Sequence, residues 1–156
     1  MKFKLDLKIQ TAVEINGKRV NAIDQVTMVG LESVASCLGS PHTFPWPWMP
    51  FIGLGQGKTP VSSEDTHLDR EIFRKYGDVF ASGLSYRVRA VFTNTPEVLE
   101  PGEDYILREV GIFDELAGGK MAVRWLLEDD IYVWTAETEP TDITGIDCTC
   151  IVWVTS

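Results

Sequence analysis

Apolar residues recur at every second position in several segments of this chain, and this two-residue period most constrains the fold. Phe3, Leu5, Leu7 and Ile9 alternate with polar residues, and residues 86–93 alternate in the same way. A period of two is typical of a strand with one buried face, whereas a helix needs a period near 3.6 residues. The sequence therefore predicts a mainly β protein.

The predicted strands follow one another with short turns between them. Asn16 and Gly17 form a dipeptide that readily adopts the positive φ of a hairpin turn. The other connections are rich in Gly, Pro, Asp and Glu, as surface turns are. Strands that mostly follow in chain order predict an antiparallel sandwich or a flattened barrel. We expect strands at residues 2–15, 86–93, 105–113, 121–127, 131–134 and 146–155.

One N-terminal segment changes period. Apolar residues between positions 22 and 38 recur at roughly helical spacing, and Gly39 offers a left-handed stop, so we expect one helix there. Residues 65–76 fit both a helix and a strand. A length of 156 residues allows a single domain over residues 21–156, preceded by an N-terminal strand or arm over residues 1–20. That strand either pairs within its own sheet or adds to the open edge of a neighbour.

The charge of the chain argues against nucleic acid as a partner. Lys and Arg number 14 against 23 Asp and Glu, which gives a net charge of −9, and no basic patch offsets it. No apolar run reaches the ~18 residues that a membrane span requires. The first ten residues alternate charged and apolar side chains, unlike the apolar core of a secretory signal. We therefore expect no membrane partner.

Residues that could carry catalysis or bind metal are few. His42 and His67 lie in loop-like sequence outside any nucleophile or zinc motif, and Cys37, Cys148 and Cys150 are too few for a disulfide framework. The acidic segments 97–104 and 128–130 lack the ligand spacing of a calcium loop, so we interpret them as solvated turns. The sequence thus predicts no catalytic residues, no metal and no cofactor, and we expect no enzyme.

The stretch after Ile52 resembles a phosphate-binding loop and fails the test for one. That motif needs Gly five residues before the Gly of Gly-Lys-Ser/Thr, and counting back from Gly57 the position is held by Ile52. Pro60 also follows where a helix should begin. We interpret these glycines as a turn through which a strand leaves the sheet.

Residues 41–50 combine four prolines with large aromatic side chains, which excludes a helix or a central strand. One interpretation is a rigid segment that covers one end of the core. The other is that Phe44, Trp46, Trp48 and Met49 contact a neighbouring protein, because aromatic side chains dominate interface energetics and a Pro-rich segment loses little entropy on binding. Phe3, Leu5 and Leu7 are candidates for the same role in the arm.

An Arg-Glu pair stands among strand-forming residues at 106–113. Arg108 and Glu109 point to opposite faces of a strand, so each needs a separate partner or water. One interpretation is simply one buried and one solvated face. Our hypothesis is that Glu109 accepts hydrogen bonds from backbone amides or an arginine, with Arg124 of the next strand as the candidate donor.

Four blocks of residues from about position 22 onward, taken in this order, resemble a family of small virion proteins of tailed bacteriophages. The pattern reads G-x-G-x-T-x-P, then D-T-x-L-x-x-E-x-x-R, then E-x-G-L-F-D, then A-R, and the Pro-Trp-rich insert at 41–50 departs from it. The matching residues are Gly55, Gly57, Thr59, Pro60; Asp65, Thr66, Leu68, Glu71, Arg74; Glu109, Gly111, Ile112, Phe113, Asp114; and Ala122 and Arg124, with Arg108 directly before the third block.

The resemblance implies a β-rich structural protein of the virion, assembled in the host cytoplasm. Trimeric capsid-decorating proteins with a tulip-like β fold are similar in size and strand content. It therefore implies a homotrimer that binds the major capsid protein or other virion proteins. A tail-fibre or baseplate protein is the alternative within this resemblance. A glycan- or small-molecule-binding sandwich that uses Trp46 and Trp48 is a second alternative.

Overall fold

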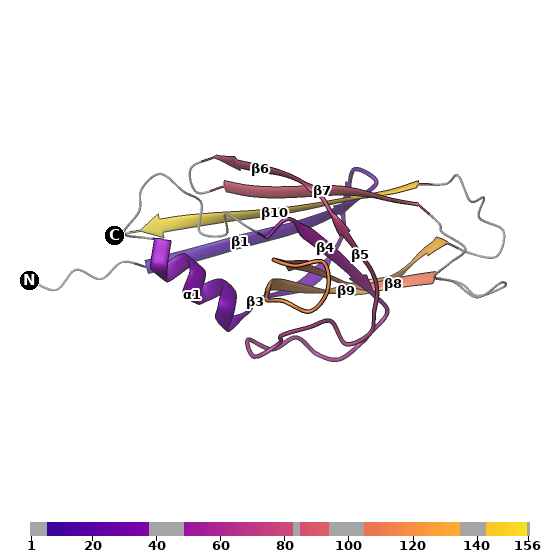
Figure 1. Ribbon diagram of the computed structural model, residues 1–156, viewed down its shortest axis with the longest axis horizontal. Coiled ribbons are helices and arrows are strands. Elements are labelled where there is room, and N and C mark those ends of the chain that lie inside the picture. Colours follow the sequence, from indigo (N-terminus) through magenta and orange to yellow (C-terminus); the bar gives the residue numbers. More distant parts are fainter. Residues whose placement is uncertain (1–5, 38–48, 83–84, 94–104, 135–142, 156) are drawn as a thin grey trace, which may run out of the picture.

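The computed structural model describes residues 6–37, 49–82, 85–93, 105–134 and 143–155, and two antiparallel sheets make up most of this part of the chain (Figure 1). Sheet A contains β1 (Asp6–Ile15), β2 (Lys18–Arg19), β6 (Asp78–Ser82), β7 (Ser85–Thr93) and β10 (Ile143–Thr155). Sheet B contains β3 (Ala22–Val26), β4 (Phe51–Gly55), β5 (Glu71–Tyr76), β8 (Tyr105–Phe113) and β9 (Met121–Trp134). The strand orders are β2-β1-β10-β7-β6 and β3-β9-β8-β4-β5. The predicted mainly β fold with antiparallel sheets is confirmed.

The main core lies between the two sheets. Alternate residues of the long strands are buried there, as the two-residue period requires, and each fully buried aliphatic side chain contributes about 1.5–3 kcal/mol. Trp125 spans the gap at one side, where its indole Nε1 donates a hydrogen bond to Thr11 Oγ1 over 2.9 Å. At the other side the chain passes from β5 to β6 through Gly77 alone, so one strand edge continues from sheet B to sheet A.

The N-terminal strand pairs within its own sheet. β1 runs antiparallel to β10 from Asp6 opposite Thr155 to Ile15 opposite Ile146. Asn16 and Gly17 have φ values of 51° and 81°, which confirms the predicted tight turn into β2. Residues 6–15 therefore follow the alternative in which the strand pairs within its own sheet, because β10 pairs with one edge of β1 along its whole length.

The predicted helix over residues 22–38 is shorter than expected. Residues 22–26 form β3, which pairs with β9 and extends sheet B, and α1 covers only Met28–Cys37. Thr27 separates the two elements because it caps the helix: its Oγ1 accepts from the Gly30 amide over 3.2 Å and its carbonyl accepts from Leu31. Among the described residues, no helix is long and apolar enough to cross a membrane.

Three other segments differ from expectation, and a fourth resolves an alternative that the sequence left open. The two strands predicted at 121–127 and 131–134 are one strand, β9, and the acidic residues 128–130 lie within it where the β8–β9 register shifts. Of the ambiguous residues 65–76, positions 71–76 form β5. β6 is an additional strand, and β10 begins at Ile143 instead of residue 146.

Candidate functional site

Residues 56–70 form a loop that leaves β4, covers the outer face of sheet B and returns as β5. We call it the covering loop; it runs below β8 and β9 in Figure 1. The Gln56 amide donates to the Arg70 carbonyl over 2.9 Å and closes its base. Leu68 packs against Phe113 and Met121 in a small apolar cluster apart from the main core. One apolar side chain thus anchors the loop, and its backbone needs polar partners beneath it.

Glu109 provides acceptors for the backbone amides of the covering loop. Its carboxylate is fully buried between sheet B and the loop. Oε1 accepts from the amides of Gly57 and Arg70 over 3.0 and 2.7 Å, and Oε2 accepts from the Asp69 amide over 3.0 Å. A buried carboxylate is stable only with such charge-assisted bonds. Glu109 therefore holds both ends of the loop onto the sheet.

Arg124 holds the middle of the same loop. Its guanidinium donates to Glu109 Oε2 from Nε over 3.2 Å and from Nη2 over 3.0 Å. It also donates to the carbonyls of Thr59 over 2.8 Å and Pro60 over 3.3 Å, and to Asp65 Oδ2 over 3.1 Å. The buried cation thus binds loop carbonyls while the buried anion binds loop amides. The hypothesis that Glu109 accepts from backbone amides and from Arg124 is confirmed.

Two glycines make room for this ion pair. A methyl group on Gly55 would collide with the Glu109 carboxylate, and one on Gly57 would collide with Asp69. Neither residue has a positive φ, so the need for glycine is close approach and not backbone conformation. The sequence analysis interpreted these glycines as a turn. In the structure, their lack of a side chain leaves room for the carboxylates of Glu109 and Asp69.

Arg74 joins β5 to the turn after β8. Its guanidinium lies 3.5 Å from the centre of the Phe113 ring and pairs with Glu71 over 2.7 Å. It also donates to the carbonyls of Glu115 and Gly118 over 2.9 and 2.6 Å. The cation–π contact and the hydrogen bonds of the guanidinium together fix the positions of Arg74 and the Phe113 ring. This turn is therefore held to β5.

The residue blocks of the phage resemblance meet around the Glu109–Arg124 pair and its neighbouring Arg74 cluster. Ile112, Asp114 and Thr66 are exceptions, because Ile112 lies in the main core, Asp114 binds the Lys120 amide in the turn after β8, and Thr66 is exposed. The residues brought together are Gly55, Gly57, Thr59, Pro60, Asp65, Leu68, Glu71, Arg74, Glu109, Gly111, Phe113 and Arg124. Ala122 connects the cluster to α1, since its carbonyl accepts from the Thr27 amide.

The predicted contact residues do not join this cluster. Met49 is 7% exposed and packs in the main core, and its carbonyl accepts from the Tyr86 hydroxyl over 2.7 Å. The sandwich therefore covers the Met49 side chain, and its contact with a neighbouring protein stays a prediction. Leu7 lies on β1 opposite Val154. Phe3, Leu5, Phe44, Trp46 and Trp48 lie outside the described residues.

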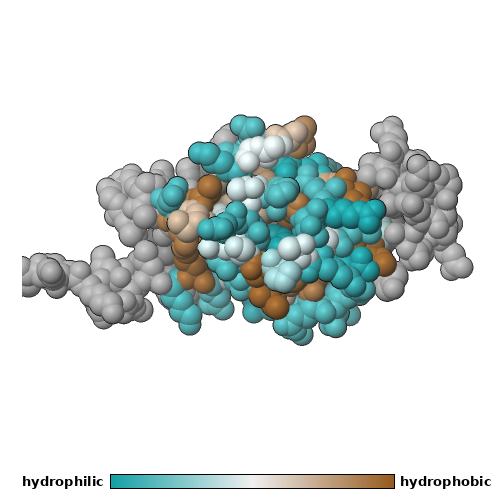
Figure 2. Space-filling model, turned by 90° about the horizontal axis from the view of Figure 1, so that it is seen from below, coloured by the Kyte–Doolittle hydropathy of each residue, from teal (hydrophilic) through white to brown (hydrophobic). Residues whose placement is uncertain are grey.

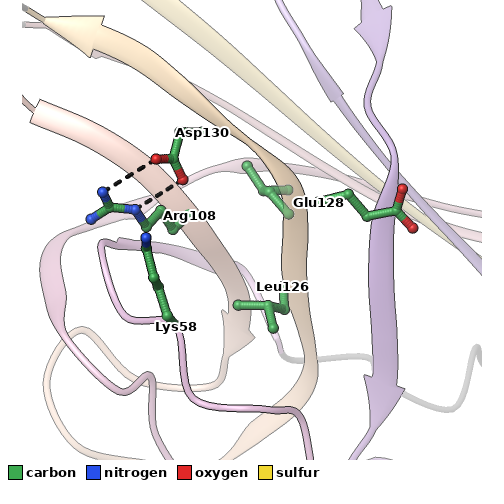
Figure 3. Close-up of a pocket in the computed structure, with 6 residues that line it drawn as sticks. Lys58, Arg108, Leu126, Glu128 and Asp130 are labelled. Atoms are coloured by element: carbon green, nitrogen blue, oxygen red, sulfur yellow. Dashed lines mark hydrogen bonds and ion pairs between the residues drawn. The ribbon is translucent and has the colours of Figure 1, made fainter.

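Arg108 lines a pocket beside the covering loop (Figure 3). It pairs with Asp130, with 3.0 Å between Nε and Oδ1, and this contact lowers the pKa of the Asp130 carboxyl below its ordinary value. The pocket measures about 240 Å³. Its lining contains Lys58, Arg108, Leu126, Leu127, Glu128 and Asp130. The sequence analysis interpreted residues 128–130 as solvated turns. It gave no signal that Asp130 pairs with Arg108 where the β8–β9 register shifts.

The surface on this side of the molecule is mostly hydrophilic (Figure 2). Hydrophobic atoms show at several places on it, one of them toward the end where α1 lies. In α1, Met28 and Leu31 are 49% and 42% exposed. Asp69 is exposed at the end of the covering loop, and the hydrogen bond from the Thr59 side chain lowers the pKa of its carboxyl. The loop thus presents charged and hydroxyl groups outward.

Within the described part of the chain, no three His, Cys, Asp or Glu side chains gather as a metal site. Cys148 and Cys150 lie in the main core, and burial raises the pKa of both thiols. Comparison with protein-family models, with curated proteins and with solved structures finds no match to this chain.

Proposed function

We propose that this chain is a structural protein of a bacteriophage virion, and specifically a capsid-decorating protein that stabilises the assembled head through repeated protein–protein contacts. One observation supports the proposal: most residues of the resemblance blocks lie together in one cluster of structural contacts around Glu109 and Arg124. The buried charged residues Glu109 and Arg124 hydrogen-bond to each other and to the covering loop.

The proposed mechanism is binding by mass action. A protein that binds assembled subunits and not dissociated ones shifts the equilibrium toward the assembly. Because such a protein binds many equivalent positions, weak individual contacts suffice. The partners are then the major capsid protein or other virion proteins. Exposed sheet edges and the fixed outer surface of the covering loop are the features that support contacts of this kind.

The deciding experiment is cosedimentation of the full-length chain with virus particles from the source that carries this sequence. We expect the chain to sediment with assembled heads and to stay in the supernatant with dissociated capsid subunits. Equal binding to both, or no binding to particles, would contradict the proposal. Gold-labelled antibody then separates the locations: label over the head supports decoration, whereas label on the tail supports the tail-fibre or baseplate alternative.

A further inference from the structure

β6 has an open edge whose hydrogen-bonding pattern follows from its register. Ser82 lies opposite Ser85 with two residues between them, so these two form a hydrogen-bonded pair of the antiparallel ladder. Alternation along the ladder then directs the backbone groups of Phe80 toward β7 and those of Val79 and Ala81 away from it. Within the described part of the chain, nothing pairs with the amides and carbonyls of Val79 and Ala81.

The other edge strands carry features that discourage pairing with a second chain. In β3, Asp24 occupies the central position, so self-pairing would bring two carboxylates together. The ladder of β5 contains a bulge, and Lys75 near its end donates to the Val91 carbonyl over 2.6 Å. β2 has only two residues and pairs only with Glu14 and Ile15, so the outer edge of β1 from Asp6 to Ala12 has no strand partner in the described part of the chain; that edge carries the charged residues Asp6 and Lys8. Short length, bulges and lysine are the means by which natural edges avoid association.

β6 carries none of these protections. Its sequence DVFAS contains no lysine or proline, and its pairing with β7 is regular from Asp78 to Ser82. Phe80 projects from the outer face of sheet A and is 56% exposed. β6 lies at the upper rim of the molecule in Figure 1. A regular edge strand with an exposed aromatic residue is a site for adding another strand.

We propose that β6 pairs with β6 of a second copy of this chain, antiparallel about a two-fold axis at Phe80. Val79 then lies opposite Ala81 of the partner and Ala81 opposite the partner's Val79, so the open amides and carbonyls form four hydrogen bonds. The two Phe80 residues form a pair without hydrogen bonds between them, where Cα atoms approach to about 4.5 Å and side chains contact most closely. Sheet A becomes continuous across the two copies.

Charge permits this pairing although the chain carries −9 overall. In the two-fold register Asp78 faces the uncharged Ser82 of the partner, so no like charges are opposite each other. Arg87 pairs with Asp147, and Asp78 lies opposite Arg89, which balances the charges beside β6. The Arg87 guanidinium lies 5.8 Å from the centre of the Phe80 ring, so each aromatic side chain is flanked by a cation.

This inference does not depend on a virion role, because it concerns the purified chain alone. A two-fold contact closes after two copies, whereas the trimer implied by the family resemblance needs a different, head-to-tail contact. Measurement of the mass in solution therefore distinguishes the two arrangements.

The test uses sedimentation equilibrium of the full-length chain over a range of concentrations. We expect association to twice the 17.5 kDa of one chain. Phe80→Asp places two carboxylates at the axis and should raise the dissociation constant at least about tenfold. The matched control is Leu116→Asp in the turn after β8, which removes a similarly exposed apolar side chain (60%) and should leave the dissociation constant unchanged.

A second variant keeps the test decisive if Phe80→Asp fails to fold. Phe80→Cys should form a disulfide between copies at position 80 on mild oxidation, since the expected Cα separation suits that bond, and peptide mass spectrometry identifies it. A monomer at all concentrations, a trimer, or a dimer that Phe80→Asp leaves intact would each overturn the proposal. The proposal is supported if Phe80→Asp loses the dimer, Leu116→Asp keeps it, and Phe80→Cys forms a disulfide between the two copies of residue 80.

Discussion

Replacing Glu109 by Gln should strongly destabilise the protein, because the new amide group cannot satisfy the surrounding donors. If its NH₂ group takes the Oε1 position, it faces the amides of Gly57 and Arg70. If it takes the Oε2 position, it faces the Asp69 amide and the Arg124 guanidinium. In either orientation at least two buried donors lose their acceptor, and Arg124 loses its buried counter-charge.

The expected cost follows from these losses. Each buried donor left without a partner costs about 1–3 kcal/mol, and breaking a buried ion pair from one side costs about 3–5 kcal/mol in total. Arg124 keeps Asp65 and two loop carbonyls, so we place the loss of unfolding free energy within that range and not above it. In a chain of this length each kcal/mol lowers Tm by about 2–4 °C. Glu109→Gln should therefore lower Tm by about 6–20 °C.

Thermal unfolding followed by circular dichroism measures this effect, with Asp130→Asn as the matched control. Asp130 is also an acid paired with an arginine beside the covering loop, but its side chain is 42% exposed. Exposed pairs contribute less than about 1 kcal/mol, so the control should lower Tm by under about 4 °C. If Glu109→Gln and Asp130→Asn changed Tm equally, the assignment of Glu109 as the acceptor for the loop would be refuted.

Three further predictions test the neighbouring contacts. Gly57→Ala should cost about 1–3 kcal/mol in chemical denaturation because its methyl collides with Asp69, whereas Gly145→Ala, which has nothing closer than 3.9 Å, should be near neutral. Helix propensity alone predicts that Gly30→Ala stabilises the chain by up to about 1 kcal/mol, but a methyl group there collides with the Ala122 carbonyl, so unfolding free energy should fall; a rise contradicts this contact. The lowered pKa of Asp69 means that its contribution is present above its unfolded pKa of 3.8 and is lost as pH falls through the lower folded value, so Asp69→Asn should flatten the acid dependence of Tm below about pH 4.

The sequence predicted the ion pair because strand geometry restricts what a buried charge can do. Arg108 and Glu109 are adjacent in a strand, so their side chains must diverge, and an interior carboxylate requires an arginine or amides. Arg124 was the basic residue at a suitable place on the next strand. The amide donors of the covering loop could not be predicted, since residues 56–70 have no periodic pattern and their backbone path depends on sheet B beneath them.

The errors in secondary structure have a related cause. Residues 22–26 carry apolar side chains that fit a helical or an extended period, and the choice depends on pairing with β9, which lies about a hundred residues away in the chain. β6 has five residues, and its place at the edge follows from the passage of the chain between sheets at Gly77. Local pattern cannot show either long-range pairing.

The presence of charged residues at positions 109 and 124 is better explained by their hydrogen bonds to the covering loop than by the stability of the ion pair itself. Apolar residues of similar volume often replace a buried ion pair without loss of stability. Here such a replacement would leave the amides of Gly57, Asp69 and Arg70 without acceptors. Leu68 is the one fully buried apolar side chain of the covering loop, so apolar contacts do not compensate for that loss. The double variant Glu109→Leu/Arg124→Met should therefore remain far less stable than the wild type in chemical denaturation. Recovery to wild-type stability would mean that the loop needs no polar anchor.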